Sequence, residues 1–280
     1  MAKKLILFIS LVLISGCSFV FYQPDRFLHA LPEKYKTEYE QRWFQASDGT
    51  KLHAWFLLNS EKLKKPKGLF VFFHGNAQNL SSHFANLVWL TKHGYDVFIF
   101  DYRGYGLVDG QPNQQGVNKD GLAALNYGHD LFKSGGYKKF IVYGQSLGGN
   151  IMARSFTEFK HKEDVDLLVF DSTFSSYQRI AFNKLKRIPL TYVLSPLAFI
   201  LVDDRFGSYK HLKDIKNPSL VIHGQKDIVV EPEHGKYIYD NIGSEKKWFW
   251  PIPGGRHIDV YYRHNLRYRK KLLDFIEREI

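Results

Sequence analysis

Short, almost continuous apolar runs recur along the chain, and helix-length segments separate them. Consecutive apolar positions fit a strand that is buried on both faces of a sheet, because successive side chains point to opposite faces. Strands that alternate with helices predict a largely parallel sheet with right-handed crossovers. The predicted strands are 69–73, 97–100, 140–142, 167–170, 220–222 and 248–250, and the predicted helices are 80–93, 116–132, 147–159, 233–241 and 264–278.

An antiparallel hairpin precedes these strands. Residues 39–45 and 52–58 alternate between apolar and polar positions, and the pair Asp48-Gly49 favours a tight turn between them. With the six apolar runs, the hairpin completes an α/β domain with a mostly parallel eight-stranded sheet and helices on both faces.

The interval 174–217 breaks the alternation of strands and helices. It contains many apolar residues but no obvious strand. A connection of this length is usually functional, and often forms a lid. We therefore predict a cap insertion between strands six and seven, whose apolar part would line an acyl pocket. A pair of ordinary packing helices is the alternative, and the two interpretations are compatible.

Composition places the chain among ordinary globular proteins. Of its 280 residues, 44% are hydrophobic and 24% charged, a balance that supports a packed core and excludes a disordered chain. The formal net charge of +11 favours anionic partners such as phospholipid headgroups, lipopolysaccharide or acidic substrates. The basic residues are spread along the chain without a nucleic-acid-binding motif, so we expect no nucleic-acid partner.

The N-terminus has the pattern of an export signal. Lys3 and Lys4 precede an apolar stretch at 5–14 that is too short to span a bilayer comfortably. The stretch ends just before Cys17, which resembles a bacterial lipoprotein signal, in which cleavage precedes a cysteine that then carries lipid. We predict a lipoprotein signal peptide at 1–16; an uncleaved signal anchor with an incidental cysteine is the alternative.

The single cysteine supports lipidation. An exported chain whose only cysteine is Cys17 has no internal disulfide to account for it. We predict a lipidated Cys17, a tether at 17–36 and the folded domain at 37–280. By resemblance to lipoprotein sorting rules, Ser18 after the cysteine favours the outer membrane. The expected location is the bacterial cell envelope, with the domain in the periplasm and a membrane contact through the lipid.

Ser146 stands in a glycine-framed turn. The run 144–148 matches G-x-S-x-G and lies between the predicted strand 140–142 and the predicted helix 147–159. A serine in such a turn needs a strained backbone to expose its hydroxyl, and the glycines remove the clashes of a Cβ. The start of a helix also favours developing negative charge. The sequence therefore predicts a nucleophile; a plain glycine-rich turn is the alternative.

A serine hydroxyl needs a base, and the base needs an orienting acid. His257 follows the last predicted strand on a glycine-rich loop, so we predict it as the base rather than a surface histidine. Asp227 lies just past the strand 220–222, and Gly224 opens a turn that can aim it. The order Ser, Asp, His is that of α/β-hydrolases. Asp171, at the end of another strand, is the rival acid.

An oxyanion hole is predicted from two backbone amides. In this fold, the loop after an early strand donates one N–H group, and the residue after the nucleophile donates the other. These positions are Asn76 and Leu147. His74, in the same loop, is predicted to hold the loop rather than to react.

Four motifs stand out: His74-Gly75-Asn76-Ala77, Asp101-Tyr102-Arg103-Gly104-Tyr105-Gly106, Gly144-Gln145-Ser146-Leu147-Gly148-Gly149 and His223-Gly224-Gln225-Lys226-Asp227. Together they resemble one family, the Bem46-type α/β-hydrolases, relatives of the ABHD depalmitoylase and lysophospholipase branch. The resemblance covers nearly the whole chain after the export signal and implies the α/β-hydrolase fold and a Ser-His-Asp triad. Val108 and Glu231 depart from the usual family pattern, outside the triad.

These residues predict a serine hydrolase that cleaves carboxylic esters or thioesters of a small-molecule or lipid acyl substrate. An amidase or aminopeptidase on the same triad remains open, because fold does not decide function. A lipid-anchored binding protein without activity is the hypothesis from another class. We expect no cofactor and no metal, since neither a phosphate-binding glycine pattern nor a metal-ligand motif is complete.

Overall fold

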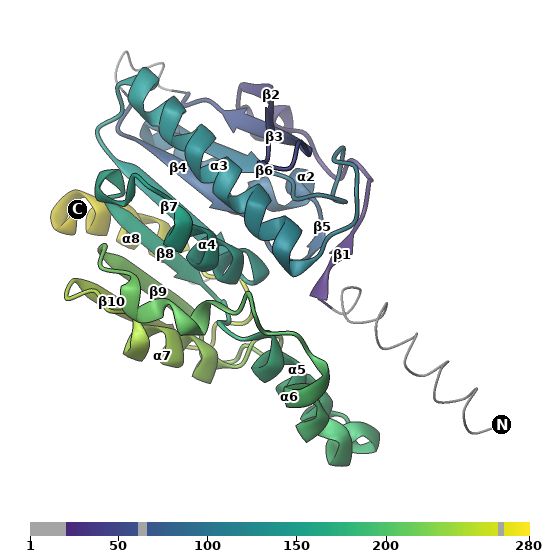
Figure 1. The fold of residues 1–280 in the computed structure, drawn as a ribbon. Coiled ribbons are helices and arrows are strands. Elements are labelled where there is room, and N and C mark those ends of the chain that lie inside the picture. The colour runs from purple at the N-terminus through teal and green to yellow at the C-terminus, as the bar shows by residue number, and fades with distance from the viewer. Residues whose placement is uncertain (1–20, 61–65, 263–265) are drawn as a thin grey trace.

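One mixed sheet forms the centre of the molecule (Figure 1). The computed structural model describes residues 21–60, 66–262 and 266–280. In spatial order the eight strands are β10 (Lys247–Ile252), β9 (Ser219–Gly224), β8 (Leu167–Asp171), β7 (Phe140–Gln145), β4 (Gly68–Phe73), β6 (Tyr95–Phe100), β3 (Lys51–Leu57) and β2 (Tyr39–Gln45). Strand β3 runs antiparallel to both β2 and β6, and all other neighbours are parallel. The predicted eight-stranded, mostly parallel sheet is confirmed.

Helices cover both faces of the sheet, as predicted. On one face lie α3 (Gln114–Gly135), α4 (Leu147–Glu158) and α7 (Pro232–Asn241), whose apolar residues share one buried cluster. The other face holds α2 (Leu80–His83), the 3-10 turns η2 (Phe84–Asn86) and η3 (Val88–His93), and α8 (Arg267–Glu279). Further short 3-10 turns are η1 (Pro32–Tyr35), η4 (Lys162–Asp164), η6 (Ser208–Lys210) and η7 (Leu212–Asp214).

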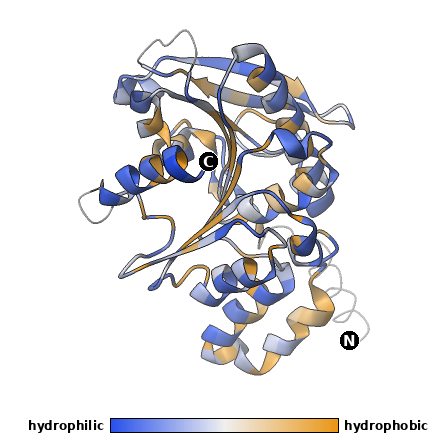
Figure 2. Ribbon diagram, turned by 90° about the vertical axis from the view of Figure 1, so that its left-hand side faces the viewer, coloured by the Kyte–Doolittle hydropathy of each residue, from blue (hydrophilic) through white to orange (hydrophobic). Residues whose placement is uncertain are grey.

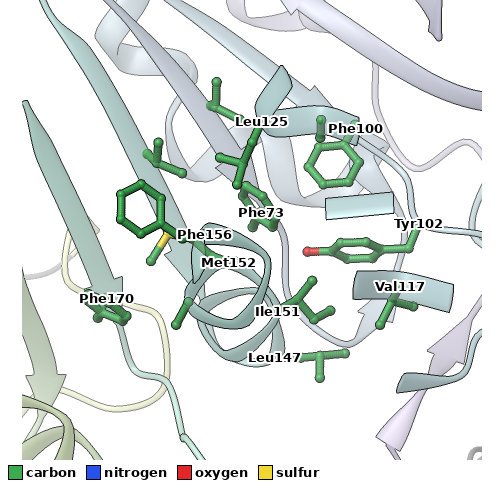
Figure 3. Close-up of a cluster of buried hydrophobic side chains, with 14 of the residues drawn as sticks. Phe73, Phe100, Tyr102, Val117, Leu125, Leu147, Ile151, Met152, Phe156 and Phe170 are labelled. Carbon is green, nitrogen blue, oxygen red and sulfur yellow. The ribbon is translucent and has the colours of Figure 1, made fainter. Parts of the chain in front are cut away.

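The continuous apolar runs arise because each strand supplies both cores. Along β4, Leu69, Val71 and Phe73 join the cluster under α3 and α4, while Phe70 and Phe72 join the cluster under α8. Successive side chains therefore alternate between the two faces of the sheet, but the sequence shows no alternation of apolar and polar residues, because both faces are buried. Figure 3 shows part of the first cluster, where side chains of α4 pack against the strands.

The predicted helix 80–93 is wrong as a single helix. It breaks into α2, η2 and η3, and Leu90 donates its N–H to Leu87 as in a 3-10 turn. The indole of Trp89 donates to the carbonyl of Asn86 at 2.9 Å, and Thr91 Oγ1 donates to the carbonyl of Val88 at 2.8 Å. These side chains bind carbonyls that a continuous α-helix would use, which explains the tighter turns.

The cap insertion lies between β8 and β9, which are the sixth and seventh strands of the sheet in chain order. It contains α5 (Tyr177–Arg187), η5 (Pro189–Leu197) and α6 (Ala198–Leu201), which project from the body as a helical hairpin (Figure 1). The apolar residues Tyr177, Ile180 and Ala181 at the start of α5 are buried, but most apolar residues from Ile188 onward are exposed. We expected this stretch to line an acyl pocket; instead its second half faces outward.

Residues 21–36, which the sequence predicts as part of a tether, pack on the domain. Tyr22 is buried, and β1 (Gln23–Pro24) pairs in parallel with β5 (Ala77–Gln78) in a sheet of two short strands. Cys17 and the predicted signal peptide lie outside the described residues. Among the described residues, no helix is both long and apolar enough to cross a bilayer.

Candidate active site

Ser146 occupies a strained turn between β7 and α4. Its backbone has φ 53° and ψ −121°, a conformation that costs about 1–3 kcal/mol for a residue with a Cβ. Two glycines permit the turn. A Cβ on Gly144 would lie 2.5 Å from the Cα of Gly149, and one on Gly148 would collide with the carbonyl oxygen of Phe73. The G-x-S-x-G spacing therefore exists because backbones touch on both sides of the serine.

The loops after β9 and β10 deliver Asp227 and His257 to one place. The two strands are parallel neighbours, so their carboxyl ends share an edge. The loops are also bonded to each other: Lys226 donates its N–H to the carbonyl of Gly255 at 2.8 Å. Gly224 has Arg256 so close behind it that a Cβ would lie 2.5 Å from that residue's carbonyl oxygen.

Three predicted side chains meet at this edge of the sheet. His257 Nε2 lies 3.0 Å from Ser146 Oγ, and His257 Nδ1 lies 2.7 Å from Asp227 Oδ2. A carboxylate only accepts, so Nδ1 carries the proton and Nε2 is left to accept from the serine hydroxyl. The structure thus brings together Ser146, His257 and Asp227 in the order and spacing that proton transfer from a serine requires.

The environment of Asp227 keeps its carboxyl ionised. Burial raises the pKa of this carboxyl, but the hydrogen bond and charge of His257 and the amides of Val229 and Val230 outweigh burial, so the pKa is lowered. Those amides donate to Oδ1 at 2.8 and 3.0 Å. One oxygen is therefore fixed by the loop's own backbone, and the other is left for the imidazole.

Asp171, the rival acid, makes a different set of contacts. Its carboxyl accepts from the hydroxyl of Tyr143 at 2.8 Å, from the amide of Gln145 at 3.0 Å and from Ser172 Oγ at 3.1 Å. Complete burial raises the pKa of this carboxyl, and those hydrogen bonds only partly offset the rise. No hydrogen bond joins it to His257 in the described part of the chain. Its backbone carbonyl accepts from the N–H of Ser146, so it supports the turn.

The predicted oxyanion-hole residues flank the serine. Leu147 is the first residue of α4, and the N–H of such a residue has no partner within its helix. Asn76 follows Gly75, where a Cβ would lie 3.6 Å from the Cβ of Ser146. The loop after β4 and the start of α4 therefore approach Ser146 from two sides.

The side chain of Asn76 is held by contacts that our sequence analysis missed. Its Oδ1 accepts from the backbone N–H of Gln23 at 2.8 Å and from the hydroxyl of Tyr105 at 3.2 Å. Nearby, Asp25 accepts from Asn79 Nδ2 at 2.8 Å. The N-terminal segment thus fixes the loop that carries a predicted amide donor. Only the asparagine of the H-G-N-A motif hinted at such a contact.

Two buried histidines hold the same loop. His74 Nδ1 lies 2.8 Å from the carbonyl oxygen of Gly75, and His83 Nε2 lies 2.8 Å from that of Ala77. Their rings stack at 5.1 Å. Burial and the neighbouring His74 lower the pKa of His83 to about 4, so it remains neutral near pH 7. The supporting role predicted for His74 fits these contacts.

The two departures from the family pattern occupy different surroundings. Glu231 Oε1 pairs with Arg187 of the cap at 3.3 Å, and its other oxygen accepts from Asn183 at 3.3 Å, so it links α7 to the hairpin. Val108 is fully buried in the core, and its N–H donates to the carbonyl of Tyr105 at 2.9 Å. None of these interactions involves the side chains of Ser146, His257 or Asp227.

One other cluster offers metal-ligand atoms among the described residues: His129, His161 and Asp164. The two imidazoles stack at 4.1 Å with planes 5° apart, so their in-plane lone pairs run parallel rather than converge on one point. Lys133 Nζ lies 2.8 Å from the Asp164 oxygen that also contacts His129. This geometry suits an ion-pair cluster.

Comparisons with known proteins agree with this fold. A family model described as serine aminopeptidase, S33, matches residues 64–199. The chain is 31% identical to the uncharacterized protein YfhR of Escherichia coli K12, covering 91% of this chain and 86% of YfhR. It is 30% identical to the alpha/beta hydrolase domain-containing protein WAV2 of Arabidopsis thaliana, covering 88% of this chain and 81% of WAV2. It is also 28% identical to protein bem46 of Schizosaccharomyces pombe, covering 82% of this chain and 74% of bem46.

A solved structure shares the whole architecture. The esterase Pf2001 of Pyrococcus furiosus superposes with a TM-score of 0.73 at 20% identity, covering 92% of this chain and 98% of the esterase. At that identity the likeness establishes the fold alone, while the relatives above establish the family. The chain therefore belongs to the α/β-hydrolase superfamily, and it is similar to the Bem46-like hydrolases.

Proposed function

We propose that this protein is a serine hydrolase that cleaves carboxylic esters or thioesters through an acyl-enzyme. The observation that supports this most is the chain of contacts from Ser146 Oγ to His257 Nε2 and from Nδ1 to Asp227. A serine hydroxyl paired with a neutral imidazole, itself oriented by a carboxylate, is poised for nucleophilic attack.

In the proposed reaction, Ser146 Oγ attacks the carbonyl carbon while His257 Nε2 takes the hydroxyl proton. The imidazolium returns that proton to the leaving alcohol or thiol, and an acyl-serine remains. Water then attacks the acyl carbon, giving one proton to His257, which passes it back to Ser146 as the acid leaves. Asp227 stabilises the imidazolium in both steps without taking its proton.

The developing oxyanion would be bound by the backbone N–H groups of Asn76 and Leu147. Such a donor typically supplies about 3 kcal/mol of transition-state stabilisation when it is positioned in advance. The contacts from Gln23 and Tyr105 to the side chain of Asn76 supply that positioning. The strained backbone of Ser146 serves the same end by presenting Oγ and the next amide together.

An amide substrate is the second candidate, because the matching family model is described as a serine aminopeptidase. The same three groups serve amide hydrolysis, with the imidazolium protonating the leaving amine. Purified protein should be screened with p-nitrophenyl esters of increasing acyl length beside aminoacyl p-nitroanilides. Ester turnover far above amide turnover supports the proposal; the reverse order favours the aminopeptidase.

A fluorophosphonate probe tests the nucleophile. The folded wild-type protein should be labelled, and Ser146→Ala should lose both labelling and roughly 10⁶-fold of the esterase kcat, since the remaining groups act only with the nucleophile. Ser134→Ala, an exposed serine on α3, is the matched control and should be labelled like the wild type. An unlabelled but folded wild type would favour a binding protein without activity.

The two carboxylates can be separated by their amides. Asp227→Asn should lower kcat by roughly 10⁴-fold, because the amide stabilises the wrong imidazole tautomer and cannot balance the imidazolium charge. Asp171→Asn should cost far less, because its partners are Tyr143, Gln145 and Ser172 rather than His257. Steady-state kinetics on one ester measure both losses of kcat, and circular dichroism checks that each variant is folded. A larger loss at 171 would reassign the acid.

We also propose that the protein is anchored in the bacterial cell envelope through lipid on Cys17. Phe21, which is buried in the core, follows Cys17 by four residues, so the lipid would lie within about 14 Å of the folded domain. Metabolic labelling with a clickable fatty acid should mark the wild type and not Cys17→Ser. Equal labelling of both, or of neither, would reject the anchor.

A further inference from the structure

The cap hairpin presents an unusually apolar surface. Residues 188–202 contain no charged side chain. The side chains of Leu190, Val193 and Ile200 are 89%, 83% and 79% exposed. Other exposed apolar residues of the same stretch are Ile188, Tyr192, Leu194, Leu197, Phe199 and Leu201. Scattered exposed apolar residues are ordinary, but a contiguous group of this size marks a contact surface.

The apolar side chains point to several sides of the hairpin. In α6, the consecutive residues Phe199, Ile200 and Leu201 are all exposed, although neighbouring side chains on a helix point about 100° apart. The buried positions of η5 and α6 are Ser195 and Ala198. Figure 2 shows hydrophobic residues along this projecting part of the molecule. A fluid apolar phase can cover such a convex surface, whereas one flat protein face would cover only one side.

Basic residues directly precede the apolar stretch in the chain. The last turn of α5 carries Lys184, Lys186 and Arg187, all exposed. Arg187 pairs with Glu231, but within the described residues no carboxylate forms an ion pair with Lys184 or Lys186. Long lysine side chains can place their ammonium groups at lipid headgroups while apolar neighbours enter the acyl region. Basic side chains beside an apolar surface fit an anionic membrane, in which acidic headgroups lie next to the apolar acyl region.

The chain leaves the domain toward Cys17 beside the same hairpin. Tyr22 Oη lies 3.0 Å from the hydroxyl of Tyr177, the first residue of α5, and the ring of Phe21 packs on that of Tyr177 at 5.1 Å. A lipid on Cys17 would therefore hold the bilayer near the base of the hairpin. The anchor and the apolar surface thus favour the same side of the molecule.

We propose that residues 184–201 of the cap hairpin dock into the interface of an anionic lipid bilayer. Leu190, Val193 and Ile200 enter the acyl boundary, while Lys184 and Lys186 contact acidic headgroups. The docking surface is additional to the lipid anchor, and only the argument from Tyr22 rests on the proposed lipidation. Because α5 begins six residues after Asp171 at the end of β8, docking would set the active-site edge of the sheet close to the membrane surface.

A single-cysteine label tests this docking. Full-length Leu190→Cys protein, purified from membranes, is labelled with an environment-sensitive fluorophore and reconstituted into vesicles of phosphatidylcholine with phosphatidylglycerol. Lipids with quenchers on their acyl chains should quench this label strongly. Trp43→Cys, on β2 at the far edge of the sheet, is the matched control and should be quenched little. Equal, weak quenching at both positions would overturn the proposal.

The headgroup contribution has its own variant. Lys184→Gln with Lys186→Gln, in the Leu190→Cys protein carrying Cys17→Ser, should weaken binding to the same vesicles by roughly thirtyfold, since each lysine near an anionic surface contributes a factor of about five. The effect should disappear on pure phosphatidylcholine. Unchanged binding to the anionic vesicles would contradict the assignment of these lysines.

Failure of the anchor is distinguishable from failure of docking. Wild-type protein should take up no thiol label if Cys17 carries lipid; uptake there refutes the lipid anchor, and the hairpin measurement then proceeds in the Cys17→Ser background. Shielding of the label at 190 that needs no vesicles but rises with protein concentration would indicate a second copy of the chain and reject the membrane. Esterase kinetics on a soluble ester report the hydrolase proposal separately.

Discussion

The close approach of backbones around Ser146 is the constraint on which the site depends. The serine lies at φ 53°, and that conformation persists only because Gly144 and Gly148 admit neighbouring backbone where any side chain would collide. The turn has two chemical consequences. It lifts Oγ out of the strand line toward His257, and it places the N–H of Leu147 at the start of a helix, where negative charge is favoured.

The sheet converts this local strain into a site. The parallel strands β7, β8 and β9 have their carboxyl ends at one edge of the sheet, so residues that are far apart in the chain lie close together there. Asp227 and His257 come from adjacent strands whose loops are bonded to each other. The contact between Asp227 and His257 is therefore fixed independently of Ser146. The turn that carries Ser146 is held by the backbone carbonyl of Asp171, which accepts from the N–H of Ser146.

How much the sequence could predict depends on whether a feature is local. The strands were predictable because burial on both faces leaves continuous apolar runs, and the run 39–45 matches β2. The positions of Ser146, Asp227 and His257 could be proposed from glycine turns after strands. From the sequence, the preference for Asp227 over Asp171 rests only on the turn that Gly224 opens, because Asp171 ends a strand and Asp227 lies just past one. The partners of each carboxylate in the structure distinguish them.

Other features depend on distant partners, and the sequence carries little sign of them. The N–H of Gln23 bonds Asn76 although 53 residues separate them. The helix expected at 80–93 is broken by side chains such as Trp89 that bind carbonyls within the same segment. The apolar composition of 174–217 led us to expect the lining of an acyl pocket. Composition alone does not say whether a side chain faces a pocket or solvent. In the folded hairpin, Leu190 and Ile200 are exposed.

The central claim is that His257 is held by Asp227 through a short hydrogen bond while it faces Ser146. Proton NMR of the free protein measures this directly, because the Nδ1 proton of such a pair resonates far downfield of the amide region. The account predicts a downfield signal in the wild type that is absent from Asp227→Asn and His257→Gln and kept in Asp171→Asn. A signal that survives in folded Asp227→Asn would contradict it.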